Sequence, residues 1–264
     1  MQVFGNQNTA EVELTVRQEA NPWGAGSILS GFWSFARRKP IGATGAIVLF
    51  AVIAIGLLTR YAGIAPNDPD EVGVGAKFLG PGGNLFLGTD QLGRDTLSRL
   101  MFGAWISMKV GLVSVLIGIT AGTLIGISSA YAGGIADLLV QRVVDALMGF
   151  PPIILALGLM AALGASDRNV IIALIAILLP GATRVVRSQA LSIKELDFVT
   201  FAKIAGLSMP MIIWRHIFPN TINTLMVITS LQVGQVILLE ASLSFLGLGL
   251  SPGHPAWGIM VSEG

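Results

Sequence analysis

The chain contains a run of 27 residues, 110–136, without a single charged side chain. Coiled as a helix, such a run is about 40 Å long, more than the ~30 Å needed to cross the hydrocarbon core of a bilayer. Four further runs also lack charge, at 41–58, 146–166, 169–183 and 217–239. Backbone N–H and C=O groups in lipid must form their hydrogen bonds within the protein, because no water is available, and this favours helices. The pattern therefore predicts an all-α fold, a polytopic membrane helix bundle with five spans.

The composition agrees with a membrane protein and narrows the chemistry. Hydrophobic residues make up 53% of the 264 positions and charged residues 12%, about half of the roughly 25% that is usual in soluble domains. Cysteine is absent, which excludes a disulfide framework, a thiol nucleophile and a cysteine metal site. The two histidines, His216 and His254, lie far apart in the sequence. We therefore predict no metal site, no cofactor and no catalytic residue.

Basic residues set the predicted orientation. Residues 1–40 are polar and mixed, and they end in a short amphipathic segment flanked by the basic triplet 37–39, which is typical of an interfacial helix. Near the span ends, ten Lys and Arg residues lie on the side of the N-terminus and six on the other side, and such an excess marks the cytoplasmic side. We expect a cytoplasmic N-terminal tail over 1–40, a transmembrane domain over 41–264, and the segment 184–216 in the cytoplasm.

The connections between the spans have patterns of their own. Residues 88–109 predict an interfacial helix that leads into the second span, and residues 136–145 predict a short polar connection after it. Glycines recur about every four residues in the second span, at positions 111, 118, 122 and 126. This spacing predicts close contact with another helix.

The segment "FVTFAKIAGLSMPMIIWRHIFPN", 198–220, differs from the uncharged runs on either side of it. Gly206 suits the left-handed position just past a helix end, and Ser208 can cap the start of a second helix. We predict two short helices folded back at the glycine, with Pro219 marking the shift into the fifth span. An apolar stripe on the first helix consists of Phe198, Val199, Phe201, Ala202 and Ala205. Such a stripe either docks on a partner or packs back onto its own bundle. A DNA-binding helix-turn-helix is disfavoured because no basic recognition face is present.

Four blocks of sequence, together with this segment, resemble one family of transporters. Ala202, Gly206 and Pro219 fall at the spacing of the coupling-helix loop of ABC importer permeases. The blocks are similar to the dipeptide/oligopeptide/nickel branch, second-permease (DppC/OppC-like) type, and the resemblance covers most of 30–264. They are "LGTDQLGRDTLSRLMFGAWIS" (87–107), "RVVDALMGFPP" (142–152), "RHIFPN" (215–220) and "EASLSFLGLGLSP" (240–252).

The resemblance implies a subunit that forms half of a translocation pore in the bacterial inner membrane, for peptides or related small solutes. A homologous second permease would supply the other half, two cytoplasmic ATPases would receive the 184–216 loop, and an extracytoplasmic binding protein would deliver the cargo. The residues expected to couple to the ATPases are Thr200, Phe201, Ala202, Lys203, Gly206, Ser208 and Pro219. Because no G-x-x-x-x-G-K-[ST] stretch is present, we expect ATP hydrolysis in the partners and no enzymatic activity in this chain.

The sequence departs from the family pattern at two places. Thr200 and Phe201 stand where the family carries an acidic residue and an alanine, which affects the usual polar contact to the ATPase. The family also has a sixth span after the stretch that ends here at 264, and this chain is expected to be a shortened form without it.

Four residues outside the loop are candidates for the pore or its gate. Arg142 and Asp145 lie three positions apart, which suits either a gate near the ATPase or a local ion pair of a helix. Pro151, like Pro152 and Pro180, is expected to bend a span. Glu240 ends a long uncharged run, and an ionisable group there either faces the pore or reaches the membrane interface.

Two other functional classes are open to a chain of this kind. A secondary transporter or channel, independent of ATP, would carry inverted repeats and broken helices with charges at the midplane, and no internal repeat is apparent. An intramembrane protease would need paired Asp, or Ser with His, inside the spans, and the second, third and fourth spans hold no such pair. The sequence leaves the cargo open among peptides, nickel chelates and other small solutes.

Overall fold

The computed structural model describes residues 36–250 and 253–263. The chain divides into two compact units, 1–52 and 53–264, which are described separately. The N-terminal tail predicted over 1–40, with its interfacial helix, lies almost entirely outside the described residues. Within the first unit, the helix that begins at Pro40 exposes large apolar side chains such as Ile41 and Phe50, as expected of a helix that faces lipid.

The described residues are helical throughout, apart from loops and two isolated bridges in the loop before α4. The helices are α3 (Pro40–Ala62), α4 (Thr96–Ala132), α5 (Gly134–Met148), α6 (Pro152–Leu163), α7 (Asp167–Lys194), α8 (Asp197–Ile204), α9 (Met209–Ile212), the π-helical turn η1 (Ile213–Ile217), α10 (Phe218–Phe245) and α11 (Trp257–Glu263). The helical fold predicted from the sequence is confirmed.

In the part of the chain that the structure describes, four helices are long and apolar enough to cross a membrane: α3, α4, α7 and the continuous helix Met209–Phe245. The pair formed by α5 and α6 adds a fifth span if the two are counted together, although they are bent by 91° at their junction. The interfacial helix predicted over 88–109 does not exist as a separate element. The helix α4 begins at Thr96, capped by the side chain of Asp95, and runs unbroken for 37 residues.

The region of the predicted third span differs most from expectation. The predicted polar connection 136–145 is helical, as part of α5, and the uncharged run 146–166 contains the bend. Pro151 disfavours a helical conformation in the residue before it, so α5 ends at Met148 and α6 begins only at Pro152. At 12 residues, α6 is about 18 Å long and too short to cross the ~30 Å hydrocarbon core alone.

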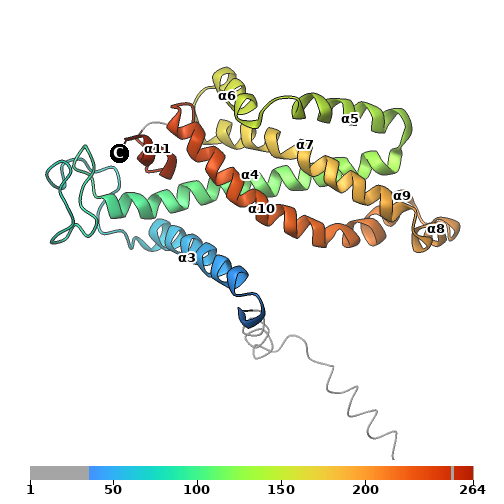
Figure 1. The fold of residues 1–264 in the computed structure, drawn as a ribbon, viewed down its shortest axis with the longest axis horizontal. Helices are drawn as coiled ribbons and strands as arrows, with labels where there is room; N and C mark the ends of the chain where they lie inside the picture. Colours follow the sequence, from blue (N-terminus) through green and yellow to red (C-terminus); the bar gives the residue numbers. More distant parts are fainter. Residues whose placement is uncertain (1–35, 251–252, 264) are drawn as a thin grey trace, which may run out of the picture. The chain divides into compact units, whose positions relative to one another are not determined.

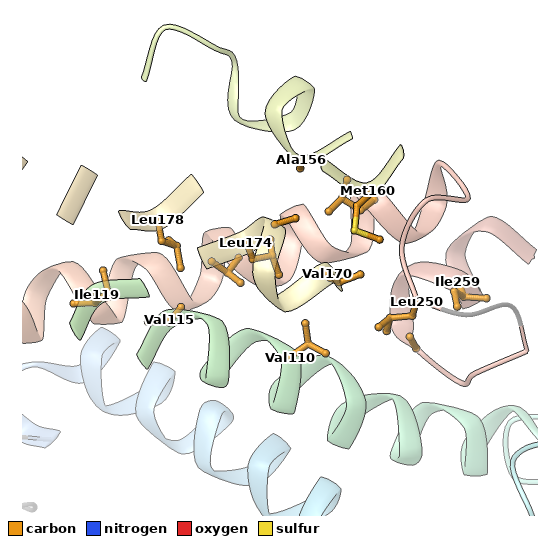
Figure 2. Close-up of a cluster of buried hydrophobic side chains, with 14 of the residues drawn as sticks. Val110, Val115, Ile119, Ala156, Met160, Val170, Leu174, Leu178, Leu250 and Ile259 are labelled. Carbon is orange, nitrogen blue, oxygen red and sulfur yellow. The ribbon is translucent and has the colours of Figure 1, made fainter. Parts of the chain in front are cut away.

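In the second unit, α4, α7 and α10 run alongside one another (Figure 1). Below, "the α8 end" of these helices is the end that carries α8, and "the α11 end" is the opposite end, where α11 and the loop before α4 lie. Figure 2 shows the main core, in which apolar side chains of α4, α6 and α7 meet those of the C-terminal region. Its buried members include Val110, Val115, Ile119, Met160, Val170, Leu174, Leu178, Leu243 and Ile259.

The glycines of α4 allow α7 to lie directly against it, as their spacing predicted. A Cβ atom added to Gly118 would lie 2.9 Å from Cβ of Leu178, and one added to Gly122 would lie 2.7 Å from Cβ of Ala182. One added to Gly126 would lie 2.6 Å from a backbone oxygen of α7. These positions have no room for any side chain, so backbone contact replaces side-chain interdigitation along this seam.

We expect Gly122→Ala to destabilise the folded protein, although alanine favours helices by up to about 1 kcal/mol over glycine. The added methyl group must push α4 and α7 apart, and overpacking of this kind costs about 1–3 kcal/mol. Thermal unfolding of the detergent-solubilised protein measures the loss. Gly158→Ala in α6 is the matched control, because nothing lies within 4 Å of its added Cβ. Equal unfolding temperatures for both variants would contradict the close packing of α4 on α7.

Candidate functional site

The loop after α7 forms a folded helical hairpin. The first helix, α8, ends in a Schellman motif at Gly206, whose φ is +77°. The N–H of Gly206 donates to the carbonyl of Lys203 (3.0 Å), and the N–H of Leu207 donates to the carbonyl of Ala202 (3.1 Å). These two bonds satisfy carbonyls at the helix end that would otherwise lack a partner. The left-handed glycine predicted from the sequence is confirmed.

The second arm of the hairpin is longer than predicted. Ser208 occupies the capping position before α9, although its side chain makes no capping bond. The helix then continues through η1 into α10 without a break, so the prediction of a separate second short helix is wrong. Pro219 lies in the first turn of α10, directly after η1. A π-helical turn is a local widening of a helix, and here it precedes the proline, which can donate no N–H bond to the preceding turn.

One side of α8 is fixed to the bundle. Val199 and Ala202 are buried in a second core at the α8 end. The other buried members of this core come from α4 (Ile127, Ala130), α7 (Val186, Ala190, Ile193), α9 (Ile212) and η1 (Ile217). The interpretation that the stripe packs on its own bundle therefore holds for these two residues.

The other side of α8 is open. The side chains of Phe201 and Ile204 are 68% and 77% exposed, and Thr200 and Lys203 on the same short helix are also exposed. Apolar side chains this open on one small helix are typical of a surface that another protein covers. The stripe predicted as a single face is thus divided between an inward side and an outward side.

Two lysines tie the α8 end of α4 to its neighbours. Lys194, from the last turn of α7, donates to the carbonyls of Ala130 (3.2 Å) and Tyr131 (3.3 Å) in the last turn of α4. Its Nζ also lies 5.3 Å from the centre of the Tyr131 ring, and Nζ of Lys203 from α8 lies 5.9 Å from the same ring. Both distances allow cation–π attraction, so Tyr131 connects α4 to α7 and to the loop helix.

Of the two gate candidates in α5, Asp145 pairs with α7 and not with Arg142. Asp145 forms its ion pair with Arg184, not with Arg142, so the predicted pairing at a spacing of three is wrong. The reason is that α5 packs along α7, which brings the guanidinium of Arg184 within reach. A second pair, between Asp137 and Arg187 (2.6 Å), joins the same two helices. The sequence analysis missed it because its partners are 50 positions apart.

The bend that carries Pro151 faces the part of α7 that contains Pro180. A cavity of about 140 Å³ lies there, lined by residues that include Phe150, Pro152, Ile177 and Pro180. Pro180 is buried and remains inside α7, so only the pair at 151–152 interrupts a helix. The prediction of a bent span is confirmed for that pair.

Glu240 lies inside the bundle. Its side chain is fully buried and accepts hydrogen bonds from two serine hydroxyls. Ser107 of α4 donates to Oε2 (3.2 Å), and Ser244 of α10 donates to Oε1 (2.8 Å). The carboxyl group therefore lies between α10 and α4 of the same chain, and the sequence offered no indication of its partner in α4.

The sequence analysis also missed an ionic cluster at the α11 end. Arg94 pairs with Asp90 (2.6 Å) and with Glu263 of α11 (2.6 Å), and Arg99 pairs with Glu263 (3.0 Å). Burial alone would raise the pKa of Asp90. Hydrogen bonds from the backbone and side chain of Arg94 and from the backbone of Leu92 outweigh burial and hold this pKa below its ordinary value of 3.8. The cluster joins the loop before α4, α4 itself and α11.

These observations define a polytopic helical membrane protein whose hairpin at one end presents an apolar face. Residues 118–264 match the family of binding-protein-dependent transport system inner membrane components. A Brucella suis protein provisionally named a peptide transport system permease is 40% identical over 220 residues, which are 83% of this chain and 73% of the relative. The glutathione transport system permease proteins GsiD of Pectobacterium atrosepticum and Escherichia coli are 35% and 38% identical over 233 residues, 88% of this chain and 77% and 76% of the relatives.

The chain belongs to this family, and it is a permease subunit of an ABC importer in a bacterial inner membrane. The resemblance noted in the four sequence blocks is confirmed. The reading as an ATP-independent transporter or channel finds no support in this membership.

Proposed function

We propose that this permease forms half of an import pore for small peptides and that α8 couples the pore to cytoplasmic ATPases. The observation that carries the proposal is the two-sided character of α8. Val199 and Ala202 fix the helix to α4 and α7, while Phe201 and Ile204 remain open to a partner. A helix held on one side and free on the other can pass motion from a docked protein into the bundle.

The coupling residues divide into two groups by their environment. Thr200, Phe201 and Lys203 are exposed on α8 and would contact the ATPase. The remaining ones set the shape of the hairpin: Ala202, Gly206, Ser208 and Pro219. Because the exposed part of α8 offers Phe201 where the family has a small residue, the receiving surface of the ATPase should be apolar.

Motion that enters at α8 would reach the α5–α6 bend through α7. The helix α7 carries both ion pairs to α5, through Arg184 and Arg187, and it also borders the cavity at the bend. A bend beside a cavity can open or close without breaking a helix. We therefore place the gate at Pro151, with Asp145 as its connection to α7 and Arg142 as an accessory charge.

The family and the names of the relatives support the proposed cargo and partners. One relative is named for peptide transport and two for glutathione transport, and glutathione is itself a small peptide. These names favour peptides over nickel chelates. The partners would be a second homologous permease, two ATPase subunits and an extracytoplasmic binding protein.

We also propose that the N-terminus and the hairpin lie in the cytoplasm, because the basic triplet 37–39 directly precedes the first span and such residues mark the cytoplasmic side. Since the chain lacks cysteine, single cysteines report cleanly on topology. A cysteine at Ser208 should react with an impermeant maleimide only from the cytoplasmic face, and one at Asn84 only from the opposite face. Labelling of both positions from one face would contradict this topology.

Reconstitution tests the function. The chain would be co-expressed with the second permease, the ATPases and the binding protein encoded by neighbouring genes, and placed in proteoliposomes. Uptake of a radiolabelled dipeptide and of radiolabelled glutathione should require ATP and every component. Uptake by this chain alone, without ATP, would overturn the proposal in favour of a secondary transporter. Uptake of neither compound by an ATP-hydrolysing complex would overturn the proposed cargo.

A further inference from the structure

The most deeply buried acidic side chain in the described part of the second unit has no ion pair. Glu240 is 0% exposed, and among residues 36–250 and 253–263 no cation bridges to it. Its two oxygens instead meet two buried hydroxyls, one from α4 and one from α10. Burying a polar group costs free energy unless the group is hydrogen-bonded, and here one of the two bonds, from Ser107, crosses the interface between α4 and α10.

The same network reaches the turn that follows α10. Ser244, which donates to Glu240, also accepts a bond from the backbone N–H of Leu250 (3.4 Å). The turn begins with Gly247 at φ +77°, and the N–H of Leu248 closes it on the carbonyl of Leu243 (3.1 Å). Glu240 therefore links three pieces of chain: α4, α10 and the turn that leads to α11.

The surroundings leave these pieces little freedom. A Cβ atom added to Gly103 of α4 would lie 2.6 Å from the carbonyl oxygen of Pro255, and one added to Gly258 of α11 would lie 2.6 Å from Cα of Ala241. The indole N–H of Trp257 donates to the carbonyl of Leu100 in α4 (3.1 Å). Because the backbones pack directly on one another here, α4, α10 and α11 cannot slide past one another without breaking the hydrogen bonds of the network.

Both helices that Glu240 joins also run to the hairpin. At the α8 end, Ile127 and Ala130 of α4 belong to the same core as the buried side of α8, and Lys203 of α8 lies over the Tyr131 ring of α4. The helix α10 is continuous with the second arm of the hairpin from Met209 onward. A displacement applied to both helices at the α8 end moves them as one unit at the α11 end only if they are held together there.

We propose that Glu240 is a positioning residue that locks α4 to α10 at the α11 end, so that the two helices carry motion between the hairpin and the opposite face of the membrane as one body. This proposal rests on the proposed importer function. It differs from the expectation that Glu240 lines the pore, because a group that lines the pore must be reachable by cargo, and this carboxyl is enclosed by its own chain.

The test uses the reconstituted complex and compares two replacements of similar size. Glu240→Gln keeps an acceptor for one serine and a donor for the other, whereas Glu240→Leu leaves both hydroxyls without their partner. The readout is the ratio of ATP hydrolysis with and without the binding protein, which is loaded with the compound that the wild-type complex imports. We expect Glu240→Leu to retain assembly and basal hydrolysis and to lose stimulation at least about fivefold, the lower end of ordinary coupling between sites. Glu240→Gln should keep most of it.

A second pair of variants covers the case in which Glu240→Leu does not fold. Ser107→Ala removes one of the two bonds, and Ser114→Ala is its control, since Ser114 is buried in the same helix but bonds only to Val110 of its own turn (2.7 Å). We expect reduced stimulation of ATP hydrolysis in Ser107→Ala and normal stimulation in Ser114→Ala, with the two variants equally stable to heat. Unchanged stimulation in Glu240→Leu, or equal stimulation in the two serine variants, overturns the lock. A wild-type complex that shows no ATP-driven uptake would instead overturn the importer function, so the two failures are distinguishable.

Discussion

Phe201→Asp is expected to abolish ATP-driven uptake while the chain still folds and inserts. The side chain of Phe201 is 68% exposed and takes no part in the core at the α8 end, so the fold does not depend on it. In the proposed complex it fills an apolar surface of the ATPase, where an unpaired carboxylate costs several kcal/mol. A loss of about 3 kcal/mol corresponds to a weakening of the contact by roughly 100-fold. Co-purification of the ATPases and uptake in proteoliposomes measure the effect.

Two further variants separate contact from shape. Phe201→Leu keeps an apolar side chain and should retain most of the uptake. Gly206→Val should abolish it by another route, because a β-branched residue is a severe misfit at positive φ, and the space around Gly206 is otherwise open. Both inactive variants should reach normal levels in the membrane. Full uptake by both single variants, Phe201→Asp and Gly206→Val, would mean that α8 only packs on its own bundle.

The turn of the hairpin could be predicted from the sequence because its determinant is local. A glycine past a helix end acts within a few residues of itself, whereas Ser208 makes no capping bond and the helix after it is longer than predicted. The same applies to the glycines of α4, whose period alone indicates a close neighbour. In both cases the pattern marks the feature, and the structure adds only the identity of the partner.

The bend between α5 and α6 could be predicted only in part. Pro151 and Pro152 indicate a bend. Hydropathy contains no information on the direction of the backbone, so the uncharged run 146–166 predicts one span. The partners of Asp145 and Glu240 were inaccessible for a related reason. The spacing rules of a single helix reach three or four residues, whereas Asp145 meets Arg184 at a separation of 39 positions and Glu240 meets Ser107 at 133.

The ionic cluster at the α11 end is the most distant of these contacts in sequence and carries the largest expected effect on stability. The side chain of Arg99 is 1% exposed and that of Arg94 is 5% exposed. Glu263 contacts both groups, at 3.0 and 2.6 Å, and Asp90 lies 3.5 Å from Arg99. Removing Glu263 leaves the two buried arginines with Asp90 as their ion-pair partner, and Arg99 keeps its longer contact with Asp90 and a hydrogen bond to the carbonyl of Pro69 (3.4 Å).

Glu263→Ala should therefore lower the free energy of unfolding by about 3 kcal/mol, the lower end of the range for breaking a buried ion pair. The lower end is expected because Asp90 still neutralises Arg94. Removing the stranded charge as well, in Glu263→Ala with Arg99→Met, should restore part of the stability, since an apolar side chain of similar length leaves nothing unpaired. Denaturant unfolding in detergent compares the wild type, the single variant and the double variant. A double variant no more stable than Glu263→Ala would show that Glu263 acts through packing of α11 alone and not through its charge.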